Sequence, residues 1–294
     1  ITFTAIRYQT IIVIFTFLAS LLIFSSCEES QQVNQGGAMK SQVDKKYTLI
    51  TLDPGHFHAA LVQKSTYPQV NNKVYVFAPA GPDVADHLQK IEGFNNRQNN
   101  PTDWKEIVYT GDDYLEKLLK HKPGEIVVLA GKNKLKADYI QACINAGMNV
   151  LSDKPMCITT EGAEKLEKAF KIAKQKNVLL YDIMTERYSV TTALQRELSM
   201  QPEVFGKLQK GTADAPAITK ESVHHFSKKV AGSQLKRPAW YFDTNQQGEG
   251  IVDVTTHLTD LIMWEAFPGE AICFEKDVEL KSAASLVTYV DKTA

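Results

Sequence analysis

The chain has 294 residues, 44% of them hydrophobic and 23% charged, which is enough for two globular domains with their own cores. The net charge of −1 gives no basic surface, so nucleic acid is not an expected partner. The 4 cysteines are widely separated and form no Cys-x-x-Cys pair, which excludes a cysteine zinc motif and a disulfide framework as expectations.

The N-terminal segment differs from the rest of the chain. Residues 11–24 form an uncharged, largely apolar run, and Arg7 is the only charged residue before Glu28. A membrane span needs about 20 residues, so this shorter run is typical of the apolar region of a secretory signal.

A cysteine motif follows this run directly. The sequence "FSSC", which ends at Cys27, resembles the lipobox of bacterial lipoproteins, in which the cysteine is acylated. We therefore predict a lipoprotein signal peptide over residues 1–26 and a flexible tether over 27–46. The protein would then be anchored by lipid in the bacterial cell envelope, in the periplasm or at the outer membrane. The alternative is a free cysteine after a short anchor helix.

Strand-like and helix-like segments alternate over residues 47–182. This alternation is typical of parallel βαβ units, so we predict an α/β fold with a doubly wound, parallel, Rossmann-like sheet that binds a dinucleotide. The expected strands are 47–52, 73–79, 125–130, 149–153 and 178–184, and the expected helices are 58–65, 112–120, 136–147 and 160–177.

The pattern changes in residues 183–294, where strands no longer alternate strictly with helices. We predict an α+β substrate domain with a mainly antiparallel sheet. The chain stops at Ala294 just after a strand-like run, which is compatible with a truncated reading frame. The expected helices are 190–199 and 250–267, and the expected strands are 206–213, 218–229, 272–281 and 283–290.

The turn after the first expected strand reads "DPGHFH", from Asp53 to His58. A dinucleotide fold carries Gly-x-Gly-x-x-Gly here, and only the second glycine, Gly55, is present. Asp53 would place a negative charge near the phosphates, which is unfavourable. The turn has three interpretations: an altered phosphate-binding turn with Gly55 and His56 at the cofactor, a His-x-His metal pair, or an ordinary loop.

The surrounding sequence supports neither a metal nor one particular cofactor. His56 and His58 would need further ligands, and no His-Glu-x-x-His spacing supplies them, so no metal is assigned. The acidic residue expected about 20 residues further on for the adenine ribose is missing, because Asp83 comes several residues late. No arginine is placed for a 2′-phosphate. The choice between NAD and NADP is therefore open.

A lysine follows another expected strand, in the sequence Asp153-Lys154-Pro155. The carboxyl edge of a parallel sheet is where ligands bind in such folds. A lysine in a partly closed cleft can orient a substrate hydroxyl or transfer its proton. Taken alone, a surface lysine beside a turn is the simpler alternative.

The run from Gly111 to Leu180 resembles the Gfo/Idh/MocA oxidoreductases. It has a tyrosine-led helix, a strand ending near Asn133, a helix ending in Ala-Gly, and then Asp153-Lys154-Pro155 where the family has Glu-Lys-Pro. The resemblance implies that Lys154 contacts substrate and nicotinamide, and that Asn133 lies near the nicotinamide ribose.

This run departs from the family at three neighbouring positions. Gly131 and Lys132 stand where Thr-Pro is usual, and Lys136 stands where a histidine is usual.

A second signature of the same family lies in residues 237–264. Asp253, His257 and Asp260 follow a glycine-rich turn at i, i+4 and i+7, so they project from one face of a helix. The resemblance implies that His257 is the catalytic acid/base and that Asp253 supports it or binds substrate. Asp260 looks more structural. A histidine oriented by carboxylates is a sound general base, whereas read alone this pattern also fits a solvated helix face or a metal site.

Together these features predict an oxidoreductase that uses NAD or NADP, acts on a sugar or polyol hydroxyl, and is anchored to the membrane through Cys27. Two alternatives are a glycoside hydrolase of the same fold, which regenerates its cofactor in each turnover, and a non-catalytic carbohydrate-binding lipoprotein. The expected partner is a small carbohydrate-like molecule. Whether the protein forms a homo-oligomer is left open.

Overall fold

The computed structural model describes residues 46–221, 229–230, 233–281 and 284. The predicted signal peptide, Cys27 and nearly all of the tether lie outside these residues. The chain divides into two compact units, of which the larger comprises Lys45–Gln209 and Ile218–Ile272. Within the described residues, no helix is both long and apolar enough to span a membrane.

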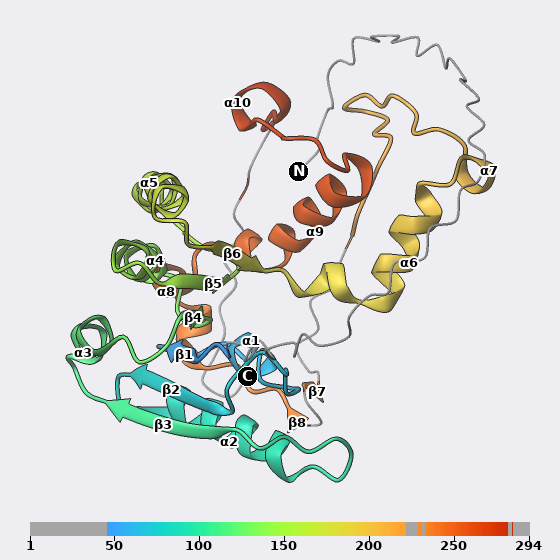
Figure 1. The fold of residues 1–294 in the computed structure, drawn as a ribbon. Helices are drawn as coiled ribbons and strands as arrows, with labels where there is room; N and C mark the ends of the chain where they lie inside the picture. Colours follow the sequence, from blue (N-terminus) through green and yellow to red (C-terminus); the bar gives the residue numbers. More distant parts are fainter. Residues whose placement is uncertain (1–45, 222–228, 231–232, 282–283, 285–294) are drawn as a thin grey trace, which may run out of the picture. The chain divides into compact units, whose positions relative to one another are not determined.

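A six-stranded parallel sheet forms the centre of the larger unit (Figure 1). Its strand order is β3-β2-β1-β4-β5-β6, and every neighbouring pair is parallel. This order confirms the predicted Rossmann-like α/β fold. The strands are β1 (Leu49–Leu52), β2 (Lys73–Ala78), β3 (Lys105–Thr110), β4 (Ile126–Leu129), β5 (Asn149–Asp153) and β6 (Leu180–Ile183).

Helices cover both faces of this sheet (Figure 1). One face packs Ile50, Val127 and Val150 against α3 (Tyr114–His121), α4 (Lys136–Asn145) and α5 (Thr160–Lys176). The other face packs Leu49 and Val74 against α1 (His58–Leu61) and α2 (Pro82–Asn96). Because both faces are covered, the inner strands read as continuous apolar runs, which is why they could be predicted.

The strand order reverses between β1 and β4. The chain leaves β1 towards one face of the sheet and leaves β4 towards the other, so their carboxyl ends form the topological switch point at which such folds bind ligands. The turn after β1, which contains Gly55, and the segment after β4, which contains Asn133, therefore meet at this edge.

Two elements of the sheet domain were not predicted. Strand β3 lies at the sheet edge with most of its side chains exposed, so it lacks the apolar run of a buried strand. Helix α2 buries Val84, His87, Ile91 and Phe94 along one face. The polar His87 within that stripe weakens its apolar pattern.

The second half of the chain is mostly helical in its described part. Two predicted helices are confirmed as α6 (Val190–Ser199) and α9 (Ile251–Ala266). The other elements are α7 (Pro202–Phe205), α8 (Thr244–Gln247), α10 (Phe274–Asp277), the 3-10 helices η1 (Thr185–Tyr188) and η2 (Ala239–Phe242), and the antiparallel pair β7 (Lys229–Val230) and β8 (Ser233–Gln234).

Two of the predicted strands are wrong. Residues 206–213 form no regular element, and residues 272–281 contain the one-turn helix α10. Nearly all side chains of both stretches are at least partly exposed, so neither buries the apolar face that holds a strand in a sheet. Most of the predicted strands 218–229 and 283–290 lies outside the described residues, and β7–β8 is the only antiparallel pair within them.

Candidate active site

The turn after β1 packs closely against the end of β4. The backbone N–H groups of Gly55 and His56 both donate to the carbonyl oxygen of Ala130, each at 3.0 Å. A Cβ atom at Gly131 would lie 2.2 Å from the carbonyl oxygen of Asp53, so only glycine permits this approach. The turn thus lies where the dinucleotide-binding turn was predicted, but these two backbone N–H groups donate to Ala130 rather than pointing to a phosphate.

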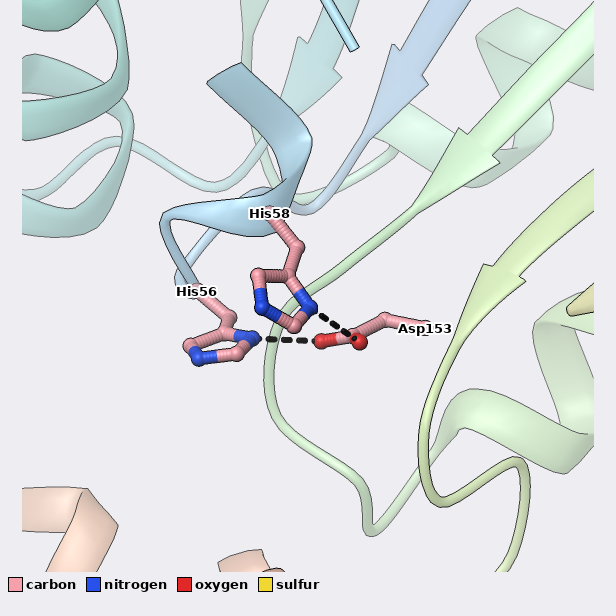
Figure 2. A group of neighbouring side chains, drawn as sticks. All are labelled: His56, His58 and Asp153. Carbon is pink, nitrogen blue, oxygen red and sulfur yellow. Dashed lines mark hydrogen bonds and ion pairs between the residues drawn. The ribbon is translucent and has the colours of Figure 1, made fainter. Parts of the chain in front are cut away.

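Both histidines of this turn bind one carboxylate (Figure 2). His56 Nδ1 lies 2.5 Å from Asp153 Oδ2, and His58 Nδ1 lies 2.7 Å from Asp153 Oδ1. All three side chains are largely buried, with exposed fractions of 14%, 5% and 2%. Sequence spacing gave no sign of this cluster because Asp153 is more than 90 residues away, and the parallel pairing of the strands brings it to the same edge.

The buried cluster has a defined charge distribution. Burial lowers the pKa of His56 to about 4, so its imidazole is neutral at pH 7. Burial alone would raise the pKa of Asp153, but charge interactions and hydrogen bonds with His56 and His58 outweigh it and hold this pKa well below its ordinary value. Asp153 is therefore ionised at pH 7.

Lys154 points in a different direction from Asp153. Its Nζ atom donates to the backbone oxygen of Asp253 at 2.5 Å and to Asp253 Oδ1 at 2.8 Å. The second carboxylate oxygen of Asp253 accepts from the Tyr241 hydroxyl, a partner that sequence reasoning missed. The structure thus joins two predicted site residues, one at the end of β5 and one on α9.

His257 lies one helical turn beyond Asp253. Its Nδ1 atom is buried and has no hydrogen-bond partner among the described residues. Burial and the nearby Lys154 lower the pKa of His257 to about 4, so a neutral ring with a basic nitrogen is present at pH 7. The carboxylate of Asp260 pairs instead with Arg187, in agreement with the structural role expected for it.

Asn133 holds the segment before α9 against the sheet. Its Nδ2 atom donates to the backbone oxygen of Gln247 at 2.8 Å, and its Oδ1 atom accepts from Lys136 Nζ at 2.6 Å. Lys136 is almost fully buried and also reaches the backbone oxygens of Asp153 and Pro155. Burial lowers the pKa of Lys136 to about 8. The sequence marked Lys136 only as a departure from the family pattern.

The fit of a dinucleotide to this edge differs between its two ends. At the nicotinamide end, Lys154 is an ammonium donor at the carboxyl edge of β5, which suits the predicted contact. At the phosphate end, a Cβ atom on Gly55 would lie 3.0 Å from Trp240 Cζ2, so the indole covers this glycine. Trp240 Nε1 donates to Asp83, which also pairs with Lys132 at 3.1 Å. Trp240 would therefore have to move aside before a nucleotide could approach Gly55.

Comparison with known families assigns both halves of the chain. Residues 82–182 match "Oxidoreductase family, NAD-binding Rossmann fold", and residues 194–294 match "Putative oxidoreductase C terminal domain". The chain belongs to the Gfo/Idh/MocA oxidoreductase family. Its first domain is thus an NAD-binding Rossmann domain, in agreement with the prediction of NAD or NADP. No curated protein matches the chain.

Several solved structures share the fold of this chain. A "putative oxidoreductase" from Parabacteroides merdae is 60% identical with a TM-score of 0.75, and the match covers 80% of this chain and 54% of that one. GenD2 from gentamicin A biosynthesis, in complex with NAD, is 17% identical with a TM-score of 0.52, covering 80% of this chain and 56% of that one. The WlbA dehydrogenase from Bordetella pertussis, in complex with NADH and UDP-GlcNAcA, is 16% identical with a TM-score of 0.50, covering 76% and 56%. The chain therefore spans about half the length of these relatives.

Proposed function

We propose that the protein is an oxidoreductase that uses NAD or NADP to oxidise or reduce a sugar or polyol at a hydroxyl-bearing carbon. The observation that supports this most directly is the convergence of Lys154, Asp253 and His257 at the carboxyl edge of the sheet. The proposal assigns all three the catalytic roles that the sequence suggested.

Lys154 is suited to orient the substrate oxygen. An ammonium group has three N–H donors, and that of Lys154 donates to the backbone oxygen of Asp253 and to one of its carboxylate oxygens. A further N–H is left to donate to a substrate hydroxyl or carbonyl oxygen. Asp253 fixes the direction of that donor, and Tyr241 in turn holds the carboxylate.

His257 is suited to take the hydroxyl proton. Hydride cannot leave a carbinol carbon productively unless the hydroxyl proton is also removed, so a base is required. His257 is neutral at pH 7 because of its lowered pKa, so one ring nitrogen is unprotonated and can accept a proton. In the reverse direction the protonated ring would return the proton.

The cofactor, when bound, supplies the acceptor or donor of the hydride. Gly55, His56, Asn133 and Lys154 are the residues proposed to hold it, and the indole of Trp240 must leave Gly55. This covering by Trp240 also favours a second candidate, a non-catalytic carbohydrate-binding protein that has lost its nucleotide.

Nucleotide binding separates these candidates. The complete protein should be purified without added cofactor and examined by mass spectrometry for bound nucleotide. Its thermal unfolding should then be measured with and without added NAD(H) or NADP(H). We expect bound nucleotide or a rise in Tm. If no nucleotide is bound and Tm does not rise, the non-catalytic candidate is favoured. Sugar release from an aryl glycoside without net redox change would instead favour the hydrolase.

We also propose that Cys27 is lipidated and anchors the protein outside the cytoplasm. The apolar run and the "FSSC" motif support this. Expression in a bacterial host with labelled palmitate should label the native protein but not Cys27→Ser. Equal labelling of both proteins would refute the anchor.

A further inference from the structure

We propose that His56, His58 and Asp153 form a site for one divalent transition-metal ion. These three side chains come from the turn after β1, the start of α1 and the end of β5, and Figure 2 shows both imidazoles directed at the same carboxylate. His56 is shared with the proposed cofactor site, but His58 and Asp153 have no part in the proposed oxidoreductase activity, so metal binding can be tested without turnover.

The geometry of the three side chains is close to that of a metal site. Each offers one donor atom, and all three atoms lie within 4.8 Å of one another. Ligand atoms around a tetrahedral ion with bonds of about 2.0 Å lie roughly 3.3 Å apart. The present contacts of 2.5 and 2.7 Å are shorter, so the carboxylate would withdraw by less than about 1 Å as the ion replaces the shared protons.

The carboxylate is anchored in a way that suits a ligand. The backbone N–H of Lys154 donates to Asp153 Oδ1 at 2.8 Å, which leaves Oδ2 for the ion. Ligating carboxylates are generally held by such a second hydrogen bond. Because Asp153 is buried, bulk water does not solvate its negative charge. A bound cation would stabilise that charge.

The imidazoles are packed in a fixed arrangement. The ring centroids of His56 and His58 are 4.1 Å apart, and the ring of Phe57 lies against both, at 4.4 and 4.6 Å. The chain bends at His56 and Phe57 as it enters α1, which lets both imidazoles reach one carboxylate. An apolar wall on one side of the donors limits solvent access to an ion.

The ligand chemistry indicates the kind of ion. Two imidazoles and one carboxylate suit Zn²⁺ or Fe²⁺ rather than Mg²⁺ or Ca²⁺, which prefer oxygen ligands. Three protein ligands leave at least one coordination position for water or a substrate oxygen, as in catalytic zinc sites. We take Zn²⁺ as the ion to test, with Fe²⁺ and Mn²⁺ as comparisons.

The test is metal binding by the complete protein, purified without a histidine tag and stripped with a chelator. We expect about one Zn²⁺ per chain by titration calorimetry and an increase in Tm on binding. His58→Gln and Asp153→Asn should each weaken binding by about 100-fold or more. The matched control is His121→Ala, which removes an exposed histidine at the end of α3 and should bind like the native protein.

Two readouts keep the test decisive if a variant folds poorly. Circular dichroism of the metal-free proteins identifies any variant that has lost its fold, and Co²⁺ bound to the native protein reports coordination through its visible spectrum. Absence of binding for Zn²⁺, Fe²⁺ and Mn²⁺ would overturn the proposal, as would equal binding by native protein and a folded Asp153→Asn. In either case the three residues are a hydrogen-bonded triad, whatever the nucleotide experiment shows.

Discussion

Lys154 and Asp253 are 99 residues apart in the chain, yet the Nζ atom of Lys154 donates to both the carboxylate and the backbone oxygen of Asp253. The two side chains are only 6% and 10% exposed. Removing one partner of a buried ion pair leaves an unpaired charge in a medium that solvates it poorly. This pair therefore fastens α9 to the sheet and also fixes the donor proposed to act on substrate.

Replacing Lys154 by Met should lower the free energy of unfolding by about 3–5 kcal/mol, because the Asp253 carboxylate then loses its cation. Chemical denaturation measures this loss. The double variant Lys154→Met/Asp253→Asn should recover part of it, since no unpaired charge remains. Strictly additive losses would show that the two residues do not interact.

His257→Gln should reduce kcat by about 10²–10⁴-fold with little change in stability, because it removes the proposed base but keeps a polar side chain. In the native enzyme, the pKa of about 4 predicts that activity rises as pH increases through 4 and is flat above it. The variant should lose that acidic limb. An unchanged kcat would exclude His257 as the base.

His87→Leu should stabilise the protein. His87 is buried in α2, and neither ring nitrogen has a hydrogen-bond partner among the described residues. Replacing an unsatisfied polar group by an apolar one of similar size should raise the free energy of unfolding by about 1–3 kcal/mol. Thermal and urea unfolding at pH 7 test this, and a lower Tm would contradict it.

The same histidine should make stability depend on pH. Burial lowers the pKa of His87 to about 4, below the ordinary 6.5 of the unfolded chain, so the unfolded state binds more protons between these values. The native protein should lose up to roughly 3 kcal/mol from this residue as pH falls from 6.5 to 4. In His87→Leu the curve should be flatter over this range, and an unchanged slope would refute the assignment.

Trp240→Ala should increase affinity for NAD(H) or NADP(H), because the indole that covers Gly55 is removed. Gly55→Ala should have the opposite effect, since its Cβ atom would enter the space that the phosphates need. Isothermal titration with each nucleotide compares the variants. Lower affinity in Trp240→Ala would mean that the indole binds the nucleotide rather than covering its site.

The sequence by itself determined the strands that are buried on both faces. Runs such as those of β1 and β4 are continuous and apolar because helices cover both sides, and this is visible without coordinates. It also singled out Lys154, Asp253 and His257, because their spacing and order match a family pattern. Edge strand β3 escaped prediction because an exposed edge places no such demand on side chains.

Only the tertiary structure decided which of these side chains meet. Asp153 joins His56 and His58, and Lys154 joins Asp253, because parallel pairing brings the carboxyl ends of distant strands to one edge. The same packing placed Trp240 over Gly55 and buried Lys136 beneath Asn133. Such contacts depend on strand order and helix docking, which no local spacing in the chain encodes.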